Sequence, residues 1–126
     1  MQSSMIYGSQ WDQIMIWMKE VKNTEYNSKY YILDSSYMGN YSTPSGGTGK
    51  KQVSGYKNAY GVKQIFDLGG NLRDWTTEVC STDGRVLRGD VYYNNGSYYP
   101  ASHRDVSILE ITDSYLSSRV ALYVSL

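Results

Sequence analysis

Cysteine, histidine and phenylalanine each occur only once among the 126 residues of this chain. The lone Cys80 excludes an internal disulfide framework and any zinc site built from several cysteines. The lone His103 is the one candidate for any histidine-dependent site. The nearby Ser102 and Asp105 are no evidence for a catalytic triad, because triads form in space. We therefore interpret His103 as a surface or binding-site residue and Cys80 as a small buried hydrophobe, and we expect no catalytic residue, metal or cofactor.

The sequence also lacks an excess of either charge, since twelve Lys and Arg residues balance twelve Asp and Glu residues. Proteins that bind nucleic acid usually carry a basic excess, so we expect no nucleic-acid partner. No apolar run approaches the roughly 20 residues of a transmembrane helix, and no signal peptide is visible, so we expect no membrane insertion. The length predicts a single domain that spans residues 1–126.

Tyrosine, by contrast, occurs fourteen times. Eight tyrosines precede residue 61, where no sequence feature accounts for them, and Tyr123 belongs to a predicted final strand. Binding surfaces favour tyrosine because it offers a large amphipathic ring with few torsions to immobilise. The remaining tyrosines therefore indicate a binding surface in the C-terminal part of the chain: Tyr92, Tyr93, Tyr98, Tyr99 and Tyr115.

Hydrophobic periodicity predicts one main helix over residues 9–22. Ser9 and Asp12 have the spacing of a capping box, and Trp17 lies off the apolar stripe, which predicts that the helix is covered on more than one side. The stripe itself has helical spacing and consists of Trp11, Ile14, Met15, Met18 and Val21.

The rest of the chain predicts short strands and long loops. The Gly-rich loop over residues 41–51 lacks the first Gly and the final Ser or Thr of a phosphate-binding loop, so we interpret it as a flexible surface loop. Asp83-Gly84 and Asn95-Gly96 predict tight turns, the first of them within a hairpin. The expected strands are Tyr30–Leu33, Val62–Leu68, Trp75–Cys80, Arg85–Leu87 and a buried last strand over residues 119–126. One helix with short antiparallel strands predicts an α+β fold.

Two stretches carry a resemblance to a known family. Residues 67–75 read Asp-Leu-Gly-Gly-Asn-Leu-Arg-Asp-Trp, and residues 85–89 read Arg-Val-Leu-Arg-Gly. They resemble the segments "D-x-x-G-N-V-W-E-W" and "R-V-x-R-G-G-S" of the formylglycine-generating-enzyme family, and Ser118-Arg119-Val120 is similar to its terminal strand. The resemblance implies a C-type lectin fold trimmed at its N-terminus. We also expect Trp75 to be a core residue. Active members of that family carry two copper-binding cysteines after the second segment. Asn94 and Tyr99 stand approximately there, which implies that the oxidase activity is absent.

Variable proteins of diversity-generating retroelements, found in phages and bacteria, form a second branch of the same fold. Their C-terminal codons are mutated at adenines, and Asn codons scattered in this way cannot yield Lys, Glu, Gln, Met or Trp. These five types occur once in residues 90–118, as Glu110, against 23 times in the other 97 residues. Residues 90–118, called the C-terminal segment below, therefore resemble a diversified binding surface in which Glu110 is a fixed position.

The resemblance implies a receptor-recognition domain that binds a protein or surface ligand of a host or target cell. We expect it on a virion, such as a phage tail, or on a bacterial cell surface, as the C-terminal part of a larger display protein. Alternatives are a metal-dependent oxidase of the formylglycine-generating type and an invariant attachment domain. Arg88, Gly89, Pro100, Ala101, Arg104 and Arg119 are expected scaffold residues. The predicted ligand-binding residues are Val91, Tyr93, Tyr98, Tyr99, His103, Asp105, Val106, Ile108, Asp113, Tyr115 and Leu116, with Tyr98 or Tyr99 as the strongest contact.

Overall fold

A computed structural model describes residues 2–20 and 32–123 and confirms the α+β class. The elements are β1 (Gln2–Met5), α1 (Gly8–Glu20), the short 3₁₀ turns η1 (Thr43–Ser45) and η2 (Asn58–Tyr60), β2 (Gly61–Val62), β3 (Ile65–Phe66), β4 (Arg73–Val79), β5 (Gly84–Arg88), β6 (Arg104–Ile108), β7 (Leu116–Ser118) and β8 (Val120–Tyr123).

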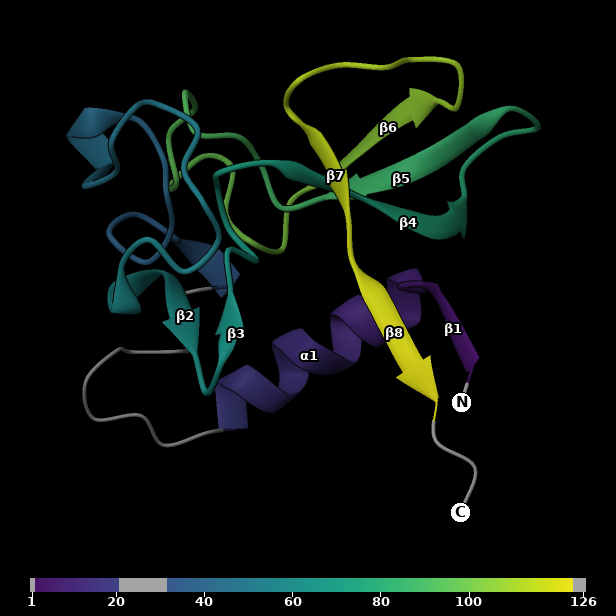
Figure 1. The fold of residues 1–126 in the computed structure, drawn as a ribbon, viewed down its shortest axis with the longest axis horizontal. Helices are drawn as coiled ribbons and strands as arrows, with labels where there is room; N and C mark the ends of the chain where they lie inside the picture. The colour runs from purple at the N-terminus through teal and green to yellow at the C-terminus, as the bar shows by residue number, and fades with distance from the viewer. Residues whose placement is uncertain (1, 21–31, 124–126) are drawn as a thin grey trace.

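Three small sheets organise the chain around the helix. The largest has the strand order β6-β5-β4-β7, and two-stranded sheets form from β1 with β8 and from β2 with β3. Figure 1 shows α1 below the four-stranded sheet, while the connection between β6 and β7 arches over the upper side of that sheet. The β4–β7 pair is parallel, so the prediction of antiparallel strands is wrong for this pair.

The helix begins earlier than the sequence pattern predicts, and its cap differs. The first helical hydrogen bond runs from the amide of Trp11 to the carbonyl of Tyr7, and the side-chain oxygen of Gln10 accepts from the amide of Tyr7 at 2.8 Å. Gln10 thus supplies the reciprocal half of a capping box around Tyr7. The predicted cap at Ser9 is wrong because Ser9 already lies inside α1, and Asp12 instead forms an ion pair with Arg88 at 2.8 Å.

The predicted apolar stripe does form the core. Trp11, Met15 and Met18 are buried, Ile14 packs against them, and Val21 lies outside the described residues. The indole nitrogen of Trp11 donates to the carbonyl of Ala101 at 3.1 Å, which anchors the C-terminal segment to the helix. Trp17 is 43% exposed, so the prediction that this side of the helix is covered is wrong.

Turn chemistry explains the two hairpins. The predicted hairpin at Asp83-Gly84 joins β4 to β5, and the amide of Cys80 donates to the carbonyl of Gly84. Cys80 itself is exposed, so its predicted burial is wrong. The predicted strand over residues 62–68 is instead the β2–β3 hairpin, because the chain reverses at Lys63 and Gln64 in left-handed conformations with φ of 49° and 71°.

Two further strand predictions need correction. Tyr30 and Tyr31 lie outside the described residues, and Ile32 and Leu33 are helical rather than extended. The final strand is present as β8, paired with β1, but Val120 and Leu122 are 66% and 64% exposed. The prediction of a buried last strand is therefore wrong at Val120 and Leu122, because β1 supplies hydrogen bonds without covering these side chains, and residues 124–126 lie outside the described residues.

Candidate binding surface

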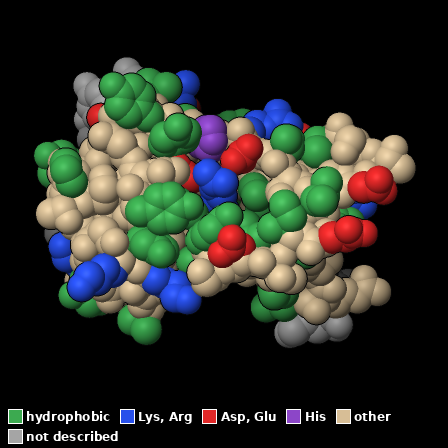
Figure 2. All heavy atoms as spheres, turned by 90° about the horizontal axis from the view of Figure 1, so that it is seen from above, with side chains coloured by type: hydrophobic (Ala, Val, Ile, Leu, Met, Phe, Trp, Pro, Cys, Tyr) green, Lys and Arg blue, Asp and Glu red, His purple; other side chains and the backbone are tan. Residues whose placement is uncertain are grey.

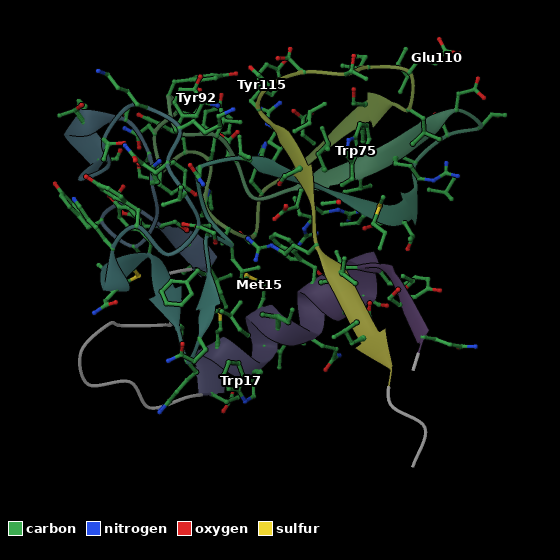
Figure 3. The ribbon with its side chains drawn as sticks, viewed as in Figure 1. Met15, Trp17, Trp75, Tyr92, Glu110 and Tyr115 are labelled. Atoms are coloured by element: carbon green, nitrogen blue, oxygen red, sulfur yellow. The ribbon has the colours of Figure 1, made fainter. Side chains whose placement is uncertain are left out.

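Part of the C-terminal segment lies on the upper side of the molecule. Figure 3 shows Trp75 above the four-stranded sheet and Tyr92 and Tyr115 at the top of the molecule, all on the side opposite Met15 and Trp17 of α1. Figure 2 shows the same side from above, with the single histidine near its middle and hydrophobic, acidic and basic side chains around it. We call this side, which carries Trp75, Tyr92 and Tyr115, the upper face.

The turn that carries Tyr98 and Tyr99 is held by the Gly-rich loop. The buried Tyr41 donates its hydroxyl to the carbonyl of Tyr99 at 2.8 Å, and the hydroxyl of the buried Ser45 accepts from the amide of Gly96. Residues 41–51 do form a loop, as predicted. The loop is nevertheless an internal support for the turn, and not merely a surface excursion.

The turn itself closes locally, as the Asn95-Gly96 pair predicts. The amides of Tyr98 and Tyr99 both donate to the carbonyl of Asn95, and the side chain of Asn95 accepts from the amide and hydroxyl of Ser97. These bonds hold Tyr98 outward, where it is 78% exposed. No strand flanks this turn in the described structure, so it is a loop rather than a hairpin.

Arg73 joins the sheet to the surface segment, and sequence reasoning missed it. It lies on β4 and forms ion pairs of 2.9 Å with the buried Asp90 and with the half-exposed Asp105 of β6. Burial lowers the pKa of Arg73, but the hydrogen bond and charge of Asp90 and the charge of Asp105 together raise that pKa above its ordinary value. The one feature of the sequence that could have indicated this role is that Arg73 stands where the family segment "D-x-x-G-N-V-W-E-W" has its first Trp.

Pairs of aromatic rings form further parts of the surface near Arg73. The ring of Tyr93 meets those of Tyr92 and Tyr115 edge to face, at centroid distances of 5.2 and 6.2 Å. Tyr99 meets His103 in the same manner at 4.9 Å. Such perpendicular pairs suit the ring quadrupoles, so the exposed tyrosines have defined positions before any ligand arrives.

Most, but not all, of the predicted ligand-binding residues are accessible. Val91 is fully buried, so its prediction as a contact residue is wrong. Loop segments show no periodicity that would separate inward from outward side chains. Leu109 and Ile111 are 55% and 42% exposed and were missed. The predicted residues that are at least partly exposed are Tyr93, Tyr98, Tyr99, His103, Asp105, Val106, Ile108, Asp113, Tyr115 and Leu116.

The sheet divides the accessible residues between two sides. Asp105 pairs in register with Leu87, and Val106 with Val86, and residues opposite each other on antiparallel strands share a face. Arg88, two residues after Val86, contacts Asp12 of α1, so Val106 points to the helix side of the sheet, as does Ile108. Both remain exposed because β6 is the edge strand. Only the other predicted residues can act together on the upper face.

Trp75 does not belong to the buried core. It lies in register with Leu87 on the upper side of the sheet, and it is half-buried rather than buried. The buried side chains of β4 are those of Asp74 and Thr76, which face the opposite way. The predicted core position of Trp75 is therefore wrong, and its ring forms part of the floor of the upper face.

The side chains present do not suit the metals that the resemblance implies. Asn94, near one expected thiol position, donates its amide to Asp90 at 2.8 Å. The resembling family also binds calcium at the loop that corresponds to residues 70–75, but here both oxygens of Asp74 are taken by Ser117 and Arg119, and burial raises the pKa of its carboxyl above the ordinary value. Among the described residues, no three His, Cys, Asp or Glu side chains gather where they could hold a metal ion.

Four cavities lined by described residues lie away from the exposed tyrosines. The first is lined by Asp67, Asp74 and Arg119, and the second by Asp12 and Arg88 beside α1. The third is lined by Asp83 and Ile108 at the β4–β5 hairpin, and the fourth by Ile14 and Leu122. The tyrosines themselves stand out on turns. Exposed side chains on turns can contact the surface of a large partner.

No protein-family model matches the sequence, and no curated protein matches it. Among solved structures, the chain is similar to Treponema denticola variable protein 1, with a TM-score of 0.63 and 20% sequence identity over 94% of this chain. The chain spans 46% of the length of that protein. This similarity shows a shared fold. Within the described ranges, no helix is long and apolar enough to cross a membrane.

Proposed function

We propose that this chain is a ligand-binding domain of the retroelement variable-protein type, with its diversified surface on the upper face. The proposal combines two independent supports. The C-terminal segment is poor in the five residue types that mutated Asn codons cannot encode. The fold is shared with a protein named as a variable protein. A C-type lectin fold of the formylglycine-generating type is the finer assignment within the α+β class.

The observation that carries the proposal is the division of the C-terminal segment into supporting and displayed residues. Val91 and Ala101 are fully buried, and Gly96 is buried against the 35–36 backbone. Between them, Tyr93, Tyr98 and Tyr99 are 48%, 78% and 38% exposed, and the exposed loop of residues 109–114 follows β6. A scaffold that fixes the backbone while displaying replaceable side chains is what a binding surface requires.

A pair of display libraries tests this proposal. The first randomises exposed positions Tyr93, Tyr98, Tyr99, Asp113 and Tyr115, and the matched control randomises buried positions Val86, Val91 and Ala101. We expect most clones of the first library to keep cooperative thermal unfolding and to yield binders when selected against a purified protein such as lysozyme. Most control clones should fail to fold. Equal loss of folding in both libraries would contradict the surface assignment.

The DNA beside the gene tests the retroelement origin. We expect a near-copy of the 3′ end that differs from it mainly at adenines, next to a reverse-transcriptase gene. Absence of such a copy would favour an invariant attachment domain with the same fold. We also propose display on a phage particle or a bacterial surface as part of a larger protein. Immunogold labelling of virions and of cells distinguishes these two locations.

The alternative enzymatic function is a metal-dependent oxidase of the formylglycine-generating type. Calorimetric titration with Cu(I), and with Fe(II) under anaerobic conditions, tests it directly. We propose that the chain is not an enzyme and expect no stoichiometric uptake of either metal. Tight binding of one equivalent of copper would overturn that proposal.

A further inference from the structure

The charges that meet at Arg73 are unequal, although the whole chain is neutral. The guanidinium of Arg73 is bound at once by Asp90 and by Asp105, at 2.9 Å from each. One positive charge therefore faces two carboxylates. Asp90 is fully buried, whereas the Asp105 side chain is 38% exposed, so the surplus negative charge is presented at the surface by Asp105.

A second carboxylate stands at the other end of the tyrosine group. Asp113 is exposed, and its carboxylate accepts a hydrogen bond from the hydroxyl of Tyr115, which raises the pKa of that hydroxyl. The Tyr115 ring meets Tyr93 edge to face, and Tyr93 meets Tyr92 in the same way. Tyr115 therefore lies beside one acidic group, and Tyr93 contacts the Tyr115 ring.

Aromatic rings add to this negative potential. The face of a tyrosine ring carries the negative part of its quadrupole and attracts cations. Two perpendicular contacts fix Tyr93 at interplanar angles of 90° and 87° while 48% of the residue stays exposed. We call Tyr92, Tyr93, Tyr115, Asp105 and Asp113 the aromatic–acidic cluster.

We propose that the aromatic–acidic cluster binds a cationic side chain, Arg or Lys, presented by a protein ligand. This inference rests on the proposed function, because it names the chemistry that the binding surface recognises in this particular sequence. The exposed carboxylates complement a guanidinium or ammonium in charge, and the flat tyrosine rings offer a face over which such a cation can lie.

An acidic partner fits the same surface poorly. A carboxylate that approached this surface would come close to the exposed carboxylates of Asp105 and Asp113, whose like charges repel it. A neutral partner could stack on the tyrosines but would leave the surface carboxylates uncompensated.

The test uses small probes and tyrosine ring signals in NMR. N-acetyl-arginine amide is the cationic probe, and N-acetyl-citrulline amide is its neutral counterpart with nearly the same shape. We expect the arginine probe to shift the ring resonances of Tyr93 and Tyr115 with millimolar affinity, and the citrulline probe to shift them little. Raising the salt concentration from about 20 to about 300 mM should weaken arginine binding, because exposed charges are screened.

Two variants separate charge from shape. Asp113→Asn should weaken arginine binding about threefold, as expected for one exposed charge pair, while Asp83→Asn at the β4–β5 turn should leave it unchanged. Tyr93→Leu keeps an apolar side chain and should also weaken binding. Equal responses to arginine and citrulline, stronger binding of N-acetyl-glutamate amide, or no effect of Asp113→Asn would each overturn the inference.

The library experiment decides the proposed function separately. If the surface library yields folded binders while the arginine probe gives no selective shift, the cationic-ligand inference alone is wrong. If both libraries lose folding to the same extent while the arginine probe binds selectively, the proposed function is wrong, and the aromatic–acidic cluster remains a cation site.

Discussion

At the scale of single residues, the described tyrosines range from fully buried to largely exposed. Tyr41 and Tyr60 are buried, whereas Tyr93 and Tyr98 are exposed. The buried Tyr41 uses its hydroxyl to hold the carbonyl of Tyr99. Part of the N-terminal tyrosine excess therefore supports the C-terminal part. Sequence composition could not show this, because the two residues meet across 58 positions of chain.

Replacing Tyr41 with Phe should remove this support. We expect Tyr41→Phe to lower the free energy of unfolding by about 1 kcal/mol, because the Tyr99 carbonyl loses a hydrogen bond in a partly buried place. Denaturant unfolding measures this loss, and faster amide exchange at Tyr98 and Tyr99 would localise it. Tyr98→Phe, at a position that is 78% exposed, is the matched control and should be neutral. Equal effects of the two substitutions would contradict the assigned support.

The hydroxyl of Tyr115 should report on its carboxylate neighbour. Its hydrogen bond to Asp113 and the charge of Asp113 both favour the neutral phenol and raise the pKa of Tyr115. Asp113→Asn should therefore lower this pKa toward its ordinary value, so that ionisation begins at lower pH. A titration of the ¹³C-labelled tyrosine ring by NMR measures the change. An unchanged pKa would show that Asp113 does not accept this bond in solution.

At the scale of elements, local signals identified the helix stripe and the β4–β5 hairpin but not the element boundaries. The stripe through Trp11, Met15 and Met18 is buried as predicted. The helix start moved from Ser9 to Gly8 because Gln10 bonds back to the Tyr7 amide. In β8, the apolar pattern predicted burial, but a two-stranded sheet leaves one face open. Periodicity specifies which side chains share a face, whereas burial depends on what packs against that face.

The β2–β3 turn offers a test of backbone conformation. Lys63 and Gln64 adopt φ of 49° and 71°, and consecutive left-handed residues of this kind are strongly preferred as Asn-Gly. The double substitution Lys63→Asn, Gln64→Gly should raise the free energy of unfolding by about 1 kcal/mol, because it relieves left-handed strain. Thermal or denaturant unfolding measures the gain. The control Lys63→Ala, Gln64→Ala should give none, and a loss of stability with Asn-Gly would refute the turn geometry.

At the scale of the whole molecule, one network joins the surface to the scaffold. Arg73 of β4 binds Asp90 at the start of the C-terminal segment and Asp105 on β6, and Trp11 of α1 holds Ala101. The displayed loop is therefore fixed from beneath at several points. Because the backbone is fixed, exposed side chains can be exchanged to bind different ligands while the fold stays stable.

Removing the central charge of this network should destabilise the fold. Arg73→Leu leaves the buried Asp90 without its ion pair, and we expect a loss of about 3 kcal/mol in the free energy of unfolding. The double variant Arg73→Leu, Asp90→Asn should recover part of that loss, because no uncompensated charge remains buried. Urea denaturation of the two variants measures both effects. A single variant as stable as the parent chain would show that Arg73 has only a surface role.

The sequence by itself determined the features that depend on local chemistry. These are the α+β class, the apolar stripe of the helix, the Asp83-Gly84 hairpin and the unusual composition of the C-terminal segment. Only the tertiary structure decided that Val91 is buried, that Trp75 lines the upper face and that Val106 points to the helix side. It also revealed Arg73 as the link between sheet and surface. Turns and periodic stripes follow from neighbouring residues, whereas exposure follows from contacts between segments far apart in the chain.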